Sequence, residues 1–282
     1  MRHEVITLSK YFPQLNTAAT LTVYVQENSP EIAPNRLRPA VIVCPGGGYA
    51  FLSDREAEPV ALAFLARGYQ VFVLRYSLSP VHYPAQLMEA ACAVACVRQN
   101  AEQWHVDAGA ISVCGFSAGG HLACSLGALW NDTELNASLG FAPERCRPNA
   151  LILAYPVITG GEFAHRGSFD NLLGNSAQSS LTAKLSLENA VGAHTPPVFL
   201  WHTLADDGVP VENSLLLAAA LRKAGVPFEL HIFPKGPHGL ALANQETKSF
   251  CYDRINPHVA QWFDLCDHWL KTMFTISDDC TN

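Results

Sequence analysis

One pentapeptide constrains this chain more than any other feature of the sequence. The segment Gly115 to Gly119, with the letters G-F-S-A-G, follows an apolar run at 110–114 and precedes an apolar helical stretch at 121–130. This order is typical of a buried strand that turns sharply into a helix. The two glycines keep side chains out of the crowded bend, so the hydroxyl of Ser117 is expected to be exposed where the strand ends.

The rest of the chain alternates between strand-like and helix-like segments. The predicted strands cover residues 20–25, 39–44, 70–74, 111–114, 150–154, 198–201 and 228–233. The predicted helices cover residues 56–67, 83–103, 121–130, 212–224 and 256–271. Such alternation favours one α/β domain over residues 1–282, with a mostly parallel, doubly wound sheet and helices on both faces. Polar and apolar residues alternate in the first strand, which predicts a half-exposed edge.

One long connection interrupts this rhythm. Residues 159–195 are rich in Gly, Ser, Asn and Ala and fall between two predicted strand ends. Connections of this length are usually functional, so the segment is predicted to be an inserted lid or substrate wall. The alternative is a surface insertion without a catalytic role. The polar residues 276–282 are expected to fray.

The composition excludes several classes of function. The chain has 282 residues, of which 49% are apolar and 15% charged, and its formal net charge is −7. Without a basic stripe, nucleic acid is not an expected partner. No apolar run approaches the length of a membrane span, so a membrane is not an expected partner either. The first residues lack the apolar core of a signal peptide, which predicts a cytoplasmic location.

The nine cysteines do not indicate a disulfide framework or a metal site. Their number is odd, and several lie within apolar segments, as Cys92 and Cys96 do one helical turn apart. They are therefore expected to be reduced, buried core residues. The sequence has no Cys-x-x-Cys pair, so no metal is predicted.

A serine hydroxyl is a poor nucleophile at neutral pH and needs an adjacent base. His238 follows the predicted strand 228–233 in a loop with neighbouring glycines, so it is expected at the same sheet edge as Ser117. An acid is expected after a strand between these two residues. Asp206 and Asp207 both follow the strand 198–201. The spacing favours Asp206, with Asp207 as the alternative, and the other aspartate is expected in the turn before Gly208.

A run of glycines completes the expected site. Gly46 to Gly48 directly follow the buried strand 39–44, which lets backbone amides approach a ligand oxygen. The amides of Gly47 and Gly48, together with that of Ala118, are predicted to form an oxyanion hole. A phosphate loop is disfavoured because no Lys-Ser or Lys-Thr follows the glycines. The side chains predicted to line the pocket are Tyr49, Phe163 and Phe169.

The motifs at 45–49, 115–123 and 195–203 resemble those of the α/β-hydrolase superfamily of esterases and lipases. Within it, the chain looks most similar to the bacterial acetyl-xylan-esterase-like branch, also described as xylanase-B-like or sugar-ester hydrolases. The resemblance runs from about residue 21 to about residue 270. Esterases that resemble hormone-sensitive lipase carry a histidine where this chain has Pro45. That departure argues against their branch.

The resemblance implies an α/β-hydrolase fold, with Ser117 as nucleophile, Asp206 as acid and His238 as base. It also implies hydrolysis of short acyl esters, such as acetyl esters of sugars or xylo-oligosaccharides, without a cofactor. The expected partner is therefore a small-molecule or oligosaccharide ester, and a homodimer stays open.

Two other functions stay open at this stage. A peptidase or thioesterase could use the same three residues, although a prolyl-oligopeptidase-like enzyme would carry a large gating domain that this chain lacks. A non-catalytic binding homologue would typically have lost the serine or the histidine, and both are present here.

Overall fold

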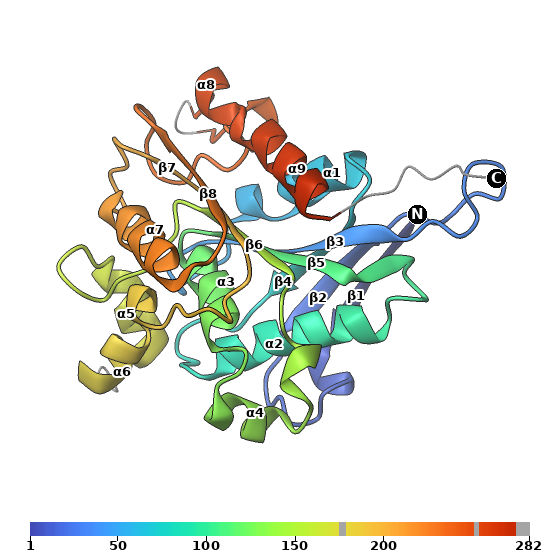
Figure 1. Ribbon diagram of the computed structural model, residues 1–282, viewed down its shortest axis with the longest axis horizontal. Coiled ribbons are helices and arrows are strands. Elements are labelled where there is room, and N and C mark those ends of the chain that lie inside the picture. The colour runs from blue at the N-terminus through green and yellow to red at the C-terminus, as the bar shows by residue number, and fades with distance from the viewer. Residues whose placement is uncertain (175–178, 251–253, 275–282) are drawn as a thin grey trace.

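The computed structural model describes residues 1–174, 179–250 and 254–274, and within these ranges one eight-stranded sheet forms the centre of the molecule (Figure 1). The strand order is β1-β2-β4-β3-β5-β6-β7-β8. The strands are β1 (Arg2–Thr7), β2 (Thr20–Val25), β3 (Arg38–Cys44), β4 (Gln70–Arg75), β5 (Val106–Phe116), β6 (Ala150–Ala154), β7 (Val198–Thr203) and β8 (Phe228–Phe233). β2 pairs antiparallel with β1 and β4, and all other pairs are parallel.

Helices cover both faces of this sheet. The helices are α1 (Glu58–Ala66), α2 (Ala85–Gln99), α3 (Ala118–Leu129), α4 (Thr133–Leu139), α5 (Arg166–Leu173), α6 (Ser179–Lys184), α7 (Glu212–Ala224), α8 (Pro257–Ala260) and α9 (Trp262–Met273). Figure 1 shows α1 and α9 on one side of the sheet and α2 and α3 on the other. The predicted α/β-hydrolase arrangement, with a mostly parallel and doubly wound sheet, is confirmed.

The two faces enclose two separate hydrophobic clusters. Along β3, Ala40 and Ile42 join the cluster beneath α2, α3 and α7, whereas Val41 and Val43 join the cluster beneath α1 and α9. Successive side chains of a strand point to opposite faces, so a strand covered on both faces is apolar at every position. This explains the continuous apolar runs in the sequence.

The predicted half-exposed edge at residues 20–25 is wrong. β2 lies between β1 and β4, and five of its six residues are buried. The edge strand on this side of the sheet is β1, which the sequence pattern did not reveal. Three of its six residues, His3 to Val5, are exposed, and charged exposed side chains are one means by which proteins protect an edge strand from unwanted pairing. Such a strand lacks the apolar alternation from which strands are predicted.

The predicted insertion at 159–195 has secondary structure of its own. It contains α5, α6 and a short 3₁₀ turn at Leu187–Asn189, while residues 175–178 lie outside the described residues. Figure 1 shows α5 and α6 beside α7, near one end of the sheet. The predicted frayed end at 276–282 also lies outside the described residues.

The cysteines within the described ranges are buried, as expected, at positions 44, 92, 96, 114, 124, 146 and 266. Burial raises the pKa of the Cys44 thiol to about 12. Across the described ranges, none of the helices combines the length and the apolar character that a membrane crossing requires.

Candidate active site

Ser117 lies at the sharp turn between β5 and α3. Its backbone has a φ of 53° and a ψ of −119°, a conformation that side-chain-bearing residues rarely adopt. A Cβ atom on Gly115 would lie 2.1 Å from the carbonyl oxygen of Gly119, and one on Gly119 would lie 2.1 Å from that of Cys44. The two glycines therefore let β5, α3 and the end of β3 pack backbone against backbone around the serine.

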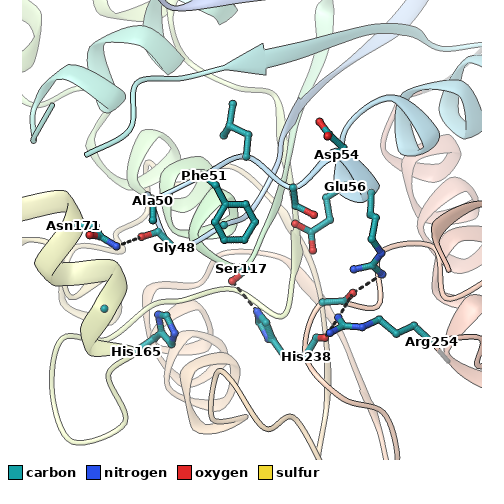
Figure 2. Close-up of a pocket in the computed structure, with 16 residues that line it drawn as sticks. Gly48, Ala50, Phe51, Asp54, Glu56, Ser117, His165, Asn171, His238 and Arg254 are labelled. Atoms are coloured by element: carbon teal, nitrogen blue, oxygen red, sulfur yellow. Dashed lines mark hydrogen bonds between the residues drawn. The ribbon is translucent and has the colours of Figure 1, made fainter. Parts of the chain in front are cut away.

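A chain of hydrogen bonds connects Ser117, His238 and Asp206. The Oγ atom of Ser117 lies 2.8 Å from Nε2 of His238 (Figure 2). On the other side of the ring, Nδ1 lies 2.8 Å from Oδ2 of Asp206 and 3.1 Å from Oδ1. These side chains follow β5, β8 and β7, whose carboxyl ends share one edge of the parallel sheet. The structure thus brings together the three residues that the sequence predicts as nucleophile, base and acid.

The two neighbouring aspartates have different positions in this arrangement. The carboxylate of Asp206 is almost fully buried and faces the imidazole of His238. In contrast, Oδ1 of Asp207 accepts a hydrogen bond from the backbone amide of His238 at 2.9 Å. Asp206 is therefore the residue in position to orient the ring, and Asp207 holds the backbone of the loop.

The surroundings of Asp206 favour its charged form. Burial by itself would raise its pKa, but hydrogen bonds from His202 and His238 outweigh burial and hold the pKa well below the usual range. The amides of Gly208 and Val209 add two donors to Oδ1, at 2.9 and 2.8 Å. A carboxylate that accepts several hydrogen bonds stays ionised and can stabilise a protonated imidazole.

His202 contacts the carboxylate of Asp206 but does not line the cavity. The ring is fully buried, with Nδ1 2.7 Å from the hydroxyl of Ser214 and Nε2 3.0 Å from the carbonyl of Val209. Its Nε2 also lies 3.3 Å from Oδ2 of Asp206. These contacts give His202 a structural role.

The glycine run forms the opposite wall of the site. Gly47 and Gly48 both line the cavity and have positive φ values of 126° and 63°. The carbonyl of Gly48 accepts a hydrogen bond from the side-chain amide of Asn171 at 2.9 Å (Figure 2). Ala118, fully buried, occupies the first position of α3, where a backbone amide has no partner within the helix. The role of these three residues as an oxyanion hole stays a prediction.

The prediction that Tyr49 lines the pocket is wrong. Its side chain is 1% exposed, and its hydroxyl lies 2.9 Å from Nδ1 of His121 within the core. A buried tyrosine usually finds a partner for its hydroxyl, and His121 on α3 supplies one beneath the glycine run. Phe169 is also buried, with its ring 5.4 Å from that of His121, so it does not line the pocket as predicted. Phe163 likewise lies outside the lining of the cavity.

A cavity of about 720 Å³ opens in front of Ser117. The residues that line it are Gly47, Gly48, Ala50, Phe51, Leu52, Ser53, Asp54, Arg55, Glu56, Ser117, His165, Gly167, Asn171, His238, Gly239 and Arg254. No sequence motif indicates a site role for Arg55, Glu56, His165, Asn171 or Arg254. Arg55 precedes the predicted helix 56–67 and Glu56 begins it, and charged residues are common at such positions. His165 and Asn171 belong to the insertion, whose position relative to the sheet no sequence pattern reveals.

Glu56 connects the glycine run to the loop that carries His238. The carboxylate is buried, with Oε2 accepting the amide of Gly46 at 2.9 Å and Oε1 accepting the hydroxyl of Tyr155 at 2.7 Å. The same hydroxyl accepts the amide of Ala241 at 2.8 Å, and the Tyr155 ring packs edge-on against His238 with 5.0 Å between centroids. One buried carboxylate thus fixes two walls of the cavity relative to each other.

Two arginines also hold the loop that carries His238. Arg55 donates to the carbonyl of Gly239 at 2.8 Å and to that of Thr247 at 2.7 Å. Arg254 donates to the carbonyls of His238 and Gly239 (Figure 2). Within the described ranges, no group of three His, Cys, Asp or Glu side chains is arranged to hold a metal ion.

Comparison with known proteins identifies relatives of this chain. A family model described as BD-FAE matches residues 28–221. The endo-1,4-beta-xylanase B of Butyrivibrio fibrisolvens is 40% identical over 214 residues, which cover 74% of this chain and 33% of that protein. The acetylxylan esterase of Xylanibacter ruminicola is 32% identical over 209 residues, which cover 72% of this chain and 41% of that protein. The chain thus spans less than half the length of these two curated relatives.

A solved structure matches over almost its full length. The acetyl ester-xyloside bifunctional hydrolase from Caldicellulosiruptor lactoaceticus superposes with a TM-score of 0.81 at 40% identity, covering 96% of this chain and 97% of that one. The family match covers more than half of the chain, and the structural match extends to all but a few per cent of it. The chain therefore belongs to the BD-FAE family, in the acetylxylan-esterase-like branch of the α/β-hydrolase superfamily.

Proposed function

We propose that this protein is a serine carboxylesterase that hydrolyses short-chain acyl esters, in particular acetyl esters of sugars or xylo-oligosaccharides. The observation that carries the proposal is the hydrogen-bonded chain from Ser117 through His238 to Asp206, in which both connections measure 2.8 Å. The names of two relatives, an acetylxylan esterase and an acetyl ester-xyloside hydrolase, support the choice of acyl group and alcohol.

In the proposed mechanism, Ser117 attacks the ester carbonyl while Nε2 of His238 takes its proton. The carboxylate of Asp206 holds the ring in the required tautomer and stabilises the imidazolium that forms. The amides of Gly47, Gly48 and Ala118 donate to the oxyanion of the tetrahedral intermediate. His238 then gives the proton to the departing alcohol, and a water molecule hydrolyses the acyl-enzyme by the same steps in reverse.

We further propose that residues 1–282 act as one α/β-hydrolase domain whose insertion at 159–195 supplies a substrate wall. Three residues from this insertion, His165, Gly167 and Asn171, line the cavity that contains Ser117. Residues of the insertion can therefore contact a bound ester and affect which esters bind.

The decisive test is a Ser117→Ala variant assayed on 4-nitrophenyl acetate. Loss of the nucleophile is expected to reduce kcat by about 10⁴-fold or more, because the remaining groups cannot form an acyl-enzyme. Ser53→Ala is a matched control, since Ser53 lines the same cavity and should keep its activity within a few fold. Full activity in the Ser117→Ala variant would refute the proposal.

Covalent labelling and a substrate panel separate the alternatives. A fluorophosphonate should add one adduct to the wild-type protein and none to the Ser117→Ala variant. A non-catalytic binding protein would not react. Faster turnover of an aminoacyl anilide or of an acetyl thioester than of acetylated xylose would instead favour a peptidase or a thioesterase.

A further inference from the structure

His165 lines the cavity, although no sequence motif indicates a role for it. It immediately precedes α5, and its ring lines the cavity together with Ser117 and His238 (Figure 2). Its Cε1 atom lies 3.9 Å from the position that a Cβ atom would take on Gly48. The ring therefore borders the glycine run on the side of the cavity that the insertion supplies.

Hydrogen bonds at one ring nitrogen determine which atom carries the proton. Nδ1 accepts the backbone amide of Ser168 at 3.3 Å and lies 2.8 Å from the hydroxyl of the same residue. A nitrogen that accepts an amide hydrogen carries no proton itself, so a neutral ring has its proton on Nε2. Within the described ranges, this Nε2–H has no hydrogen-bond partner from the protein.

The surroundings of the ring also favour its neutral form. Burial lowers the pKa of His165 below its ordinary value, and the nearby His238 lowers it further, while Asp206 opposes the change. A second cation beside the imidazolium of His238 is thereby avoided. The remaining polar side chain that the insertion contributes to the lining, Asn171, already donates to the carbonyl of Gly48.

The chemistry of an acetyl ester leaves one partner for this donor. The carbonyl oxygen of the acyl group is the atom that the oxyanion-hole amides would bind, and the methyl group offers no acceptor. Of the parts of such a substrate, only the alcohol half can then accept from a donor on His165. Sugar hydroxyl and ether oxygens are acceptors, whereas a simple aryl or alkyl alcohol offers little besides the ester oxygen.

We propose that His165 is a specificity-determining residue whose Nε2–H donates a hydrogen bond to a hydroxyl or ether oxygen of the alcohol half of the substrate. The proposal rests on the esterase function above and extends it to the class of alcohol. It makes the cavity selective for esters of sugars and other polyols. A plain ester would leave this donor unpaired in a partly buried site, which is an effective means of discrimination.

Two substitutions of His165 separate its two roles, which are to donate a hydrogen bond into the cavity and to accept one at the start of α5. His165→Asn keeps an acceptor for the amide of Ser168, because asparagine is among the best N-cap residues, but it is too short to place a donor in the cavity. His165→Gln places an amide nitrogen close to the position of Nε2. Both variants are compared with the wild-type protein on a monoacetylated methyl xyloside and on 4-nitrophenyl acetate.

We expect His165→Asn to reduce kcat/KM for the xyloside ester by about tenfold, mostly through KM, with a change below about threefold for 4-nitrophenyl acetate. His165→Gln should recover a measurable part of the preference for the xyloside. An unchanged preference in the asparagine variant, a loss shared equally by both esters, or equal preferences in the two variants would overturn the assignment. Failure of the wild-type protein to hydrolyse either ester would instead refute the esterase function.

Discussion

His121 offers a test of the structure that does not depend on activity. It lies on α3 one turn after Ser117 and is 1% exposed. Its Nδ1 lies 2.9 Å from the hydroxyl of Tyr49, and its Nε2 lies 2.9 Å from the carbonyl of Leu185. The carbonyl can only accept, so Nε2 donates and Nδ1 accepts, which satisfies the neutral ring completely.

Burial lowers the pKa of His121 to about 4, although its hydrogen bond to Leu185 acts in the opposite direction. In the unfolded chain the ordinary value is about 6.5. Above that pH neither state binds the proton, so the folded state suffers no penalty. As the pH falls from 6.5 towards 4, only the unfolded state is protonated, and the stability of the fold decreases. Each pH unit in this window costs about 1.4 kcal/mol, which amounts to about 2 kcal/mol at pH 5.

Urea unfolding of the wild-type protein and of His121→Gln at pH 7, 6 and 5 measures this effect. Glutamine has one acceptor and one donor but does not titrate, so other protonating groups cancel in the difference between the two proteins. The stability advantage of the wild type should shrink by about 2 kcal/mol between pH 7 and pH 5, or about 1 M in urea midpoint. A difference that stays constant within about 0.5 kcal/mol would refute the argument that the ring is buried and neutral.

Two further substitutions test the hydrogen bonds around the catalytic residues. Asp206→Asn should lower kcat on 4-nitrophenyl acetate by about 10⁴-fold, because its amide group would favour the wrong tautomer of His238; a loss below tenfold would assign the acid elsewhere. Glu56→Gln cannot accept from both Gly46 and Tyr155, so kcat should fall by about tenfold with KM nearly unchanged. Steady-state kinetics measures this, and an unaltered kcat in a protein of normal thermal stability would contradict the bridging role.

The sequence was sufficient to predict where the reactive side chains lie because a parallel sheet has a simple geometry. Ser117, Asp206 and His238 each follow a strand, and the carboxyl ends of parallel strands meet at one edge. The spacing favoured Asp206 but left Asp207 open, since both follow β7 within the same short loop. Hydrogen bonds in the folded loop separate them, with one facing the imidazole and the other the backbone.

The lining of the cavity was less predictable for a physical reason. Glycine runs predict the path of the backbone, but they do not predict whether a neighbouring side chain turns outwards or inwards. Tyr49 turns inwards because His121, 72 residues later in the sequence, offers a partner for its hydroxyl. Glu56 is buried for a related reason, since the amide of Gly46 and the hydroxyl of Tyr155 satisfy its charge. His121 and Tyr155 lie far from Tyr49 and Glu56 in the sequence, so no local sequence pattern predicts these hydrogen bonds.

Several contacts hold the insertion against the body of the protein. The side-chain amide of Asn171 binds the carbonyl of Gly48, and the carbonyl of Leu172 accepts the amide of Tyr83 at 2.9 Å. His121 adds the hydrogen bond to Leu185. Phe169, Leu172 and Leu173 are buried in the main core cluster.

Moving α5 away from the cavity would break the hydrogen bonds of Asn171 and Leu172, at about 1 kcal/mol each, and expose three large apolar side chains, at about 1.5–3 kcal/mol each. An opening that costs more than about 5 kcal/mol is populated by fewer than about one molecule in a thousand. Substrate exchange by displacement of α5 would then be a rare event. We therefore interpret α5 as a fixed wall of the cavity, which would hold His165 in place for the selection among alcohols that we propose.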